Sequence, residues 1–321
     1  MLLEVGLTTR VTSGTRLERL VSRCAGLATA RSVRVVGQLL LLVGLVFVGL
    51  RLRSLWHEGH IDLRRLSWPP LVGAALVAAA VVVATGFIWI LILRLLGGRP
   101  RPRWVAIFVE AQIGKYIPGS VWHYAGRAAL AGVEGLRVRA TTVSVSIELA
   151  ASVVAAAVVG MFVVGSWTFA VVAAATAFVL ALLSWRSPLR IRHAVRAGVV
   201  AVPLYVGVSL VLGIAFWLTA RALLPVGFDD VGFYTGAFAL AWVVGLVAIF
   251  APVGLGIREA ILVALLRSRL GTADAVVLAV VFRGVLTVVD VGTAAAAALV
   301  LRYGSRSRTA GSPGPLEQPD A

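Results

Sequence analysis

Two long apolar stretches of this chain are interrupted by proline and glycine, and ionisable residues gather at both interruptions. The first break contains Pro118 and Gly119, and the second contains Pro252, Gly254 and Gly256. A lipid bilayer admits irregular backbone only where protein or a water-filled cavity shields it, because an unpaired amide in hydrocarbon costs several kcal/mol. Broken helices at matching places in two halves of a membrane protein are typical of a transport pathway, so the two breaks predict a substrate site.

The composition is that of a membrane protein. Hydrophobic residues make up 60% of the 321 residues, and several apolar runs reach the ~20 residues that cross ~30 Å of hydrocarbon. The formal net charge of +16 comes mostly from arginines in predicted loops beside these runs. That placement favours membrane topology and anionic lipid head groups as the reason for the charge. No nucleic-acid partner and no cofactor is expected.

The hydrophobic pattern predicts an all-α polytopic integral membrane protein with about six transmembrane helices and two re-entrant broken-helix hairpins. Full spans are expected at 35–52, 71–94, 141–163, 167–184, 198–220 and 275–301, and hairpins at 104–133 and 236–267. Each hairpin arm has about 13 residues and is ~20 Å long, which is too short to cross the bilayer comfortably. Each hairpin is therefore expected to dip into the membrane and to return to its own side.

The predicted segments form an inverted repeat within a transmembrane domain at 35–301. A span, a hairpin and a span at 71–163 recur in the same order at 198–301, and adding 134 to the number of Pro118 gives Pro252. The first unit starts outside and the second inside, so the hairpin tips would meet near the midplane. Residues 1–34 would form a basic N-terminal segment, and residues 302–321 a disordered tail.

The arginines predict the orientation of the chain. If both termini are cytoplasmic, the inner loops hold most of the chain's arginines, as the positive-inside rule requires. The weak point of this orientation is the outer loop at 51–69, which holds four arginines.

Eight ionisable residues lie in or beside the predicted membrane segments: Glu110, Lys115, Arg127, Glu148, Arg258, Glu259, Arg283 and Asp290. A charge at the bilayer centre costs ~2.5–3.5 kcal/mol on insertion scales, so such side chains face the protein interior or water. They either pair off to hold the bundle together or line a polar pocket. Arg283 and Asp290 lie two helical turns apart on the last span, and we expect them to pair with other elements, such as Glu148, rather than with each other.

The breaks add features that favour a pocket for an anion. Ser120 can cap the returning arm of the first hairpin, and free N–H groups at helix N-termini attract phosphate or carboxylate. The cations expected to bind such a group are Lys115, Arg127, Arg258 and Arg283. Glu148, Glu259 and Asp290 would hold these cations in place or contact a cationic head group. His123 precedes Arg127 by four residues, and we expect it either to line the pocket with Arg127 or to form a hydrogen bond near the membrane interface. No catalytic or metal-binding residue is expected.

Both breaks resemble signatures of a known family. Residues 114–127 resemble the first signature of the lysylphosphatidylglycerol synthase membrane-domain family, and Pro252 to Ala260 look like the second, with Val253 where glycine is usual. The resemblance implies a flippase-like domain in the bacterial plasma membrane. In the best-understood branch this domain moves an aminoacylated phospholipid to the outer leaflet and a soluble synthase domain follows it. Because the chain has only about twenty residues after its last span, synthase activity is not implied.

These observations predict a translocase, not an enzyme, for an anionic or aminoacylated phospholipid or glycolipid. One alternative is an integral-membrane enzyme of lipid-linked glycan synthesis, for which Asp229 and Asp230 are the acidic pair in a loop. Another is an accessory subunit of envelope biosynthesis. The lipid, the direction of transport and the energy source stay open, as do a homodimer and a protein partner.

Overall fold

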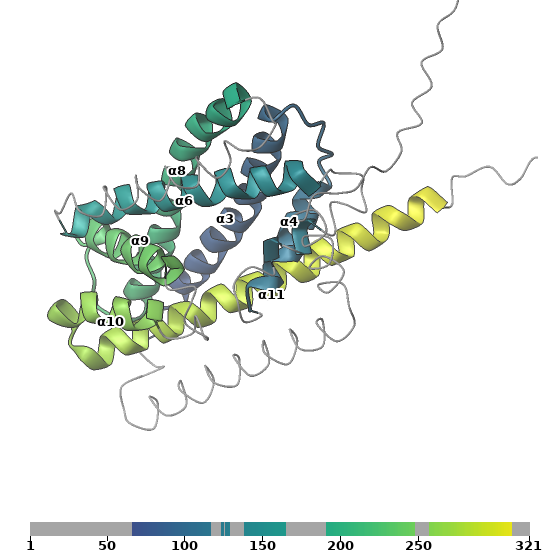
Figure 1. Cartoon of the computed structure of the whole chain (residues 1–321). Coiled ribbons are helices and arrows are strands. Elements are labelled where there is room, and N and C mark those ends of the chain that lie inside the picture. Colours follow the sequence, from purple (N-terminus) through teal and green to yellow (C-terminus); the bar gives the residue numbers. More distant parts are fainter. Residues whose placement is uncertain are drawn as a thin grey trace, which may run out of the picture.

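The computed structural model describes residues 66–116, 123–124, 126–128, 138–164, 191–247 and 257–309, and all regular structure within these ranges is helical. The elements are α3 (Trp68–Leu95), α4 (Trp104–Ala111), the 3₁₀ helix η1 (Gln112–Tyr116), α6 (Val138–Val164), α8 (Ile191–Leu223), α9 (Val231–Val247), α10 (Ile257–Leu270) and α11 (Thr272–Thr309). Figure 1 shows α11 running along one side of the bundle, past α10 near its start and past α4 further along.

Four of the described helices are long and apolar enough to cross a membrane, namely α3, α6, α8 and α11. They coincide with the helices that the sequence predicts as spans at 71–94, 141–163, 198–220 and 275–301. The spans expected at 35–52 and 167–184 lie outside the described residues. So do both breaks, with Pro118, Gly119, Ser120, Pro252, Gly254 and Gly256.

The last helix is longer than the sequence predicts. α11 continues to Thr309, so the first part of the tail expected to be disordered is helical. The physical reason is that residues 302–309 contain no proline to end the helix. At its other end α11 begins directly after Gly271, whose φ of +77° gives the left-handed turn between α10 and α11.

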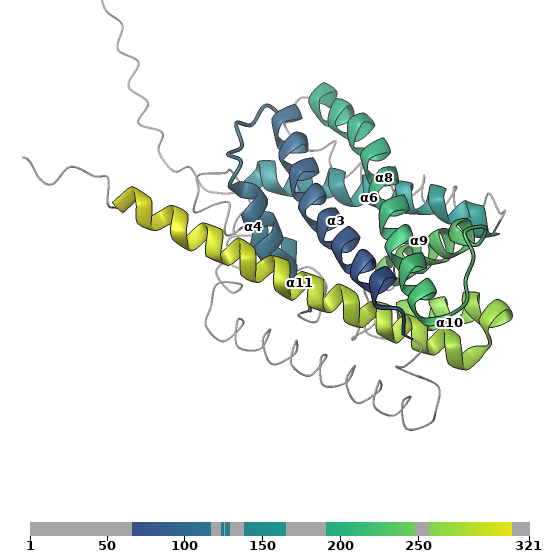
Figure 2. The same ribbon diagram turned by 180° about the vertical axis from the view of Figure 1, so that it is seen from behind.

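The long helices α3 and α8 pack side by side, as both ribbon views show (Figures 1 and 2). The Ser67 N–H just before α3 donates to the carbonyl of Ala222 near the end of α8, at 2.9 Å. The start of α3 therefore lies beside the end of α8, and the two helices run antiparallel.

Aromatic rings fill the core between α8, α9 and α11. The Phe216 ring centroid lies 5.0 Å from that of Phe282 and 5.6 Å from that of Phe238, and all three side chains are buried. Elsewhere the helices approach closely at small residues, as expected in a bilayer where apolar burial alone does not hold helices together. One such approach is between α8 and α9, where Gly213 lies against Thr235.

Helices α9 and α10 form an antiparallel pair. The outer ends, which are the ends farther from the break at 248–256, meet at an ion pair. Asp230, just before α9, lies 3.3 Å from Arg269 near the end of α10. The inner ends meet where Gly245 of α9 lies against Arg258 of α10, because a Cβ added to this glycine would lie 3.0 Å from the Arg258 Cβ. The chain thus leaves the bundle end near residue 230 and returns to it near residue 270.

Residues that follow the first break contact the helix that precedes it. After α4 and η1, the described part of the returning arm is limited to residues 123–124 and 126–128. The Arg127 guanidinium in this arm lies 4.5 Å from the ring centroid of Phe108 in α4. The returning arm therefore lies beside the outgoing helix.

Gly213→Ala is expected to lower the melting temperature of the protein. The added methyl group would overlap the Cγ2 of Thr235 and would lie 2.7 Å from its Cα, and overpacking of this kind costs about 1–3 kcal/mol. Thermal unfolding in detergent, followed by tryptophan fluorescence, measures the change. Gly207→Ala in the same helix is the matched control, because a Cβ there meets nothing within 4 Å. Equal melting temperatures for the two variants would contradict the close packing of α8 on α9.

Candidate functional site

The predicted site residues in the described part of the chain fall into two clusters. The Arg127 cluster, between α3, α4 and α6, consists of Arg127, Glu148, Trp89, Phe108 and Tyr124. The Asp290 cluster, between η1, α10 and α11, consists of Lys115, Tyr116, Arg258, Glu259, Arg283 and Asp290. The sequence predicts one pocket with four cations, whereas the contacts divide those cations between two clusters.

The Arg127 side chain is enclosed by a carboxylate and three aromatic rings. Its guanidinium forms a two-point ion pair with Glu148 of α6, and the residue is only 1% exposed. The centroids of three aromatic rings surround the guanidinium carbon, at 5.1 Å for Trp89, 4.5 Å for Phe108 and 5.3 Å for Tyr124. An anionic ligand could reach this guanidinium only by displacing Glu148.

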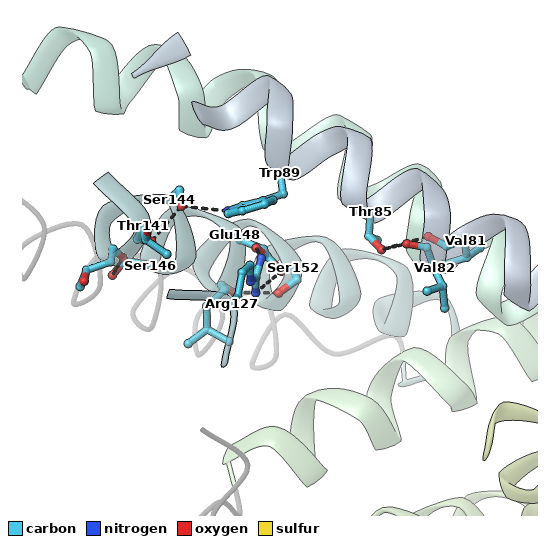
Figure 3. A network of polar contacts seen from close by, with 12 residues as sticks. Val81, Val82, Thr85, Trp89, Arg127, Thr141, Ser144, Ser146, Glu148 and Ser152 are labelled. Carbon is cyan, nitrogen blue, oxygen red and sulfur yellow. Dashed lines mark hydrogen bonds and ion pairs between the residues drawn. The ribbon is translucent and has the colours of Figure 1, made fainter. Parts of the chain in front are cut away.

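Hydrogen bonds hold the Trp89 ring in place beside this ion pair (Figure 3). The Trp89 indole N–H donates to the Ser144 Oγ at 3.0 Å, and the Ser144 hydroxyl donates to the Thr141 carbonyl at 2.8 Å. Trp89 comes from α3 and Ser144 from α6, so the polar contacts join the helices that enclose Arg127. The Arg127 cluster therefore braces the first half of the described chain.

Asp290 is the centre of the second cluster. It lies on α11 and is 2% exposed. Its Oδ2 accepts from the Lys115 ammonium at 2.7 Å and from the Tyr116 hydroxyl at 2.6 Å. Both donors belong to η1, so this carboxylate connects the end of the first broken segment to the last long helix.

Arg283 lies two turns before Asp290 on α11. Its Nη1 is 3.4 Å from the Glu259 Oε1 of α10, and its guanidinium carbon is 5.8 Å from the centroid of the Tyr116 ring. The expectation that Arg283 and Asp290 pair with other elements is confirmed. The suggestion of Glu148 as their partner was wrong, because the returning arm of the first broken segment places Arg127 against Glu148.

Arg258 carries a charge for which the described residues supply no carboxylate at ion-pair distance. Its guanidinium carbon lies 4.9 Å from the centroid of the Phe238 ring, and its Nε is buried with no hydrogen-bond partner among the described residues. It is within electrostatic range of Arg283, Glu259 and Asp290. Its neighbours in the preceding break, residues 248–256, include no acidic residue.

The charges of the Asp290 cluster therefore do not balance. Lys115, Arg258 and Arg283 are cations, and the carboxylates among them are Glu259 and Asp290, which leaves one positive charge in excess. A partly buried cation without a counter-charge is costly and attracts an anion. The cluster can thus bind a singly charged anionic group at Arg258 and Arg283.

The other predicted site residues have different outcomes. Ser120 lies outside the described residues. His123 is half-buried, and its ring centroid is 3.7 Å from that of Tyr124, which places it beside the Arg127 cluster. Within the described ranges, no group of three His, Cys, Asp or Glu residues could hold a metal ion.

Tyr116 is not among the predicted site residues, although it contacts both Asp290 and Arg283. The sequence feature that could have identified Tyr116 is its position directly after Lys115 in an apolar segment. A tyrosine hydroxyl inside a membrane protein needs a polar partner.

Comparison with known proteins gives this chain no relative, since no family model, no curated protein and no solved structure matches it.

Glu148→Gln is expected to lower the free energy of unfolding by about 3–5 kcal/mol, because it leaves the buried Arg127 without its carboxylate. Chemical unfolding in mixed micelles measures this loss. Asp230→Asn is the matched control, because it removes one partner of the exposed ion pair with Arg269 and should cost less than about 1 kcal/mol. Equal losses in the two variants would show that the Arg127 cluster is not a brace.

Proposed function

We propose that the protein is a translocase of the bacterial plasma membrane that moves a lipid with an anionic head group between leaflets. The observation that carries the proposal is the excess positive charge at Arg258, inside a bundle whose long helices are apolar enough to span a bilayer. A partly buried cation of this kind needs a negatively charged guest, and membrane lipids with phosphate groups are the guests at hand.

The order of the helices supports an inverted repeat. Long, short and long elements follow one another as α3, α4–η1 and α6, and again as α8, α9–α10 and α11. The first members of the two units, α3 and α8, contact each other and run antiparallel. Antiparallel first spans are expected for units of opposite topology, which is the arrangement of many secondary transporters.

The lengths of α9 and α10 support a re-entrant hairpin. They have 17 and 14 residues, or ~26 Å and ~21 Å at ~1.5 Å per residue, short of the ~30 Å hydrocarbon core. Their outer ends are joined by the ion pair between Asp230 and Arg269. The pair therefore enters and leaves on one side of the membrane, and its inner end carries Arg258.

The head group would lie between the broken segments while the acyl chains stay in the bilayer. Arg258 and Arg283 bind its phosphate, and Glu259 orients Arg283 or contacts the amine of an aminoacylated head group. Rocking of the two units about the midplane would alternate access to the site. The motifs at both breaks, which resemble those of flippase-like domains, support the same assignment and both cytoplasmic termini.

A specific contact weakens the alternative of an integral-membrane enzyme. Asp230, one of the acidic pair which that alternative needs for catalysis, accepts the Gly227 N–H at 3.3 Å and pairs with Arg269. These contacts give Asp230 a structural role at the start of α9. The alternative of an accessory subunit predicts instead that the charges near Arg258 can be replaced by apolar side chains without loss of function.

Arg258→Gln combined with Arg283→Gln is expected to slow lipid movement by at least about tenfold, since charge-assisted hydrogen bonds to phosphate are among the strong ones. The assay follows fluorescent phosphatidylglycerol across vesicles that contain the purified protein, with fluorescent phosphatidylcholine as the zwitterionic comparison lipid. Arg269→Gln, an exposed position in the same helix, is the matched control and should leave the rate unchanged. Unchanged movement of phosphatidylglycerol by the folded double variant would refute the assignment of the site.

A further inference from the structure

We propose that Lys115, Tyr116 and Asp290 form a latch between the two helical units, and that this latch opens when an anionic head group reaches Arg258 and Arg283. The inference rests on the proposed function for the identity of the guest. The latch itself is supported by the contacts of Lys115 and Tyr116 with Asp290, whatever the guest is.

Three ion pairs join described residues within the two clusters, and one of the three joins the two units. Arg127 pairs with Glu148, 21 residues later, and Glu259 pairs with Arg283, 24 residues later. Each of these pairs ties the returning arm of a broken segment to the long helix that follows it. The charges are reversed between the units, because the arm supplies the cation in the first and the anion in the second.

The contacts of Asp290 differ from these pairs because they join distant parts of the chain: Tyr116 and Asp290 are 174 residues apart. They tie the outgoing arm of the first unit to the last helix of the second. When two units rock against each other, pairs within a unit can stay closed, whereas a contact between units has to break and re-form. Lys115, Tyr116 and Asp290 are therefore placed where a conformational change would act.

The chemistry of the contact suits a switch with two states. The Asp290 side chain is 3% exposed, so a carboxylate that lost both donors would be buried without a partner, which is strongly unfavourable. The Lys115 side chain is 37% exposed, so the ammonium can leave toward water or toward another anion. Opening of the latch therefore requires that water or another donor replaces both side chains at Asp290.

The element that carries the two donors is the weakest part of its arm. Residues 112–116 are a 3₁₀ helix at the end of α4, and 3₁₀ turns have poorer hydrogen-bond geometry and often mark hinges. The hinge lies directly before the proline–glycine break of the first segment. Movement of η1 therefore needs no disruption of a long helix.

Tyr116 couples the latch to the proposed binding residues. Its hydroxyl donates to Asp290 while its ring lies against the Arg283 guanidinium. When Tyr116 leaves Asp290, it also uncovers Arg283, the neighbour of Arg258. A head-group phosphate that enters beside these arginines offers Lys115 a second anion and so competes with Asp290. Ligand binding and latch opening then favour each other.

The chain itself offers a direct probe, because Lys115 is its only lysine. The full-length protein in lipid nanodiscs is treated with an amine-acetylating reagent, and the rate at the Lys115 peptide is read by mass spectrometry against a reference peptide. Asp290→Asn is expected to raise this rate about tenfold, the factor for losing a charge-assisted hydrogen bond. The matched control Asp230→Asn, at the exposed pair with Arg269, should label as the wild type does.

Tyr116→Phe provides a second variant that keeps the ring and removes one donor from Asp290, so it should label at an intermediate rate even if Asp290→Asn folds poorly. A rate for both variants within about twofold of the wild type would overturn the latch, because the lost hydrogen bonds would then not restrain Lys115.

A disulfide tests whether the latch has to open. In a Cys24→Ser background, Lys115→Cys with Asp290→Cys is expected to cross-link under oxidation, to stop lipid movement and to recover when reduced. Lipid movement that continues in the cross-linked protein would overturn the gating role. The two proposals can fail separately. If Asp290→Asn raises the acetylation rate of Lys115 as expected, but the wild-type protein moves neither phosphatidylglycerol nor phosphatidylcholine, the proposed function is wrong. The contact of Lys115 with Asp290 then still stands.

Discussion

The cost of placing a charge inside a bilayer governs the structure of this chain. Each ionisable side chain in a membrane-embedded segment needs a counter-charge, a hydrogen-bond partner or water. The ion pairs of Arg127 with Glu148 and of Lys115 with Asp290 meet this need within the protein. Arg258 has no carboxylate at ion-pair distance among the described residues, which is why we propose it as the site for an anionic ligand.

The ion pairs also differ in how tightly they hold their arginines. Arg127 is enclosed by Glu148 and three aromatic rings, so it stabilises the packing of α3, α4 and α6 and is poorly placed to meet a lipid. Arg283 is held by a single longer contact with Glu259 and is partly exposed. A side chain held this loosely can exchange its partner for a ligand at small cost. The cations that the sequence groups together are thus held in two different ways.

Most of the described architecture was predictable, because runs of apolar residues long enough to cross a bilayer leave few alternatives. The helix ends were less predictable: α8 begins at Ile191 although its apolar run starts later, since the hydrophobic pattern does not register basic residues such as Arg192 that extend the helix. The types of the site residues followed from the cost of buried charge. Their partners did not, because the pairing of Lys115 with Asp290 depends on how two distant segments pack.

We infer that the Asp290 cluster, as the described residues define it, holds one positive charge in excess and that an anionic lipid neutralises it. Native mass spectrometry of the protein extracted from membranes of mixed lipid composition tests this claim most directly. We expect bound lipid to be enriched in anionic species in the wild type, and the enrichment to be lost in Arg258→Gln. Bound lipid with the composition of the surrounding membrane, in both proteins, would contradict the claim.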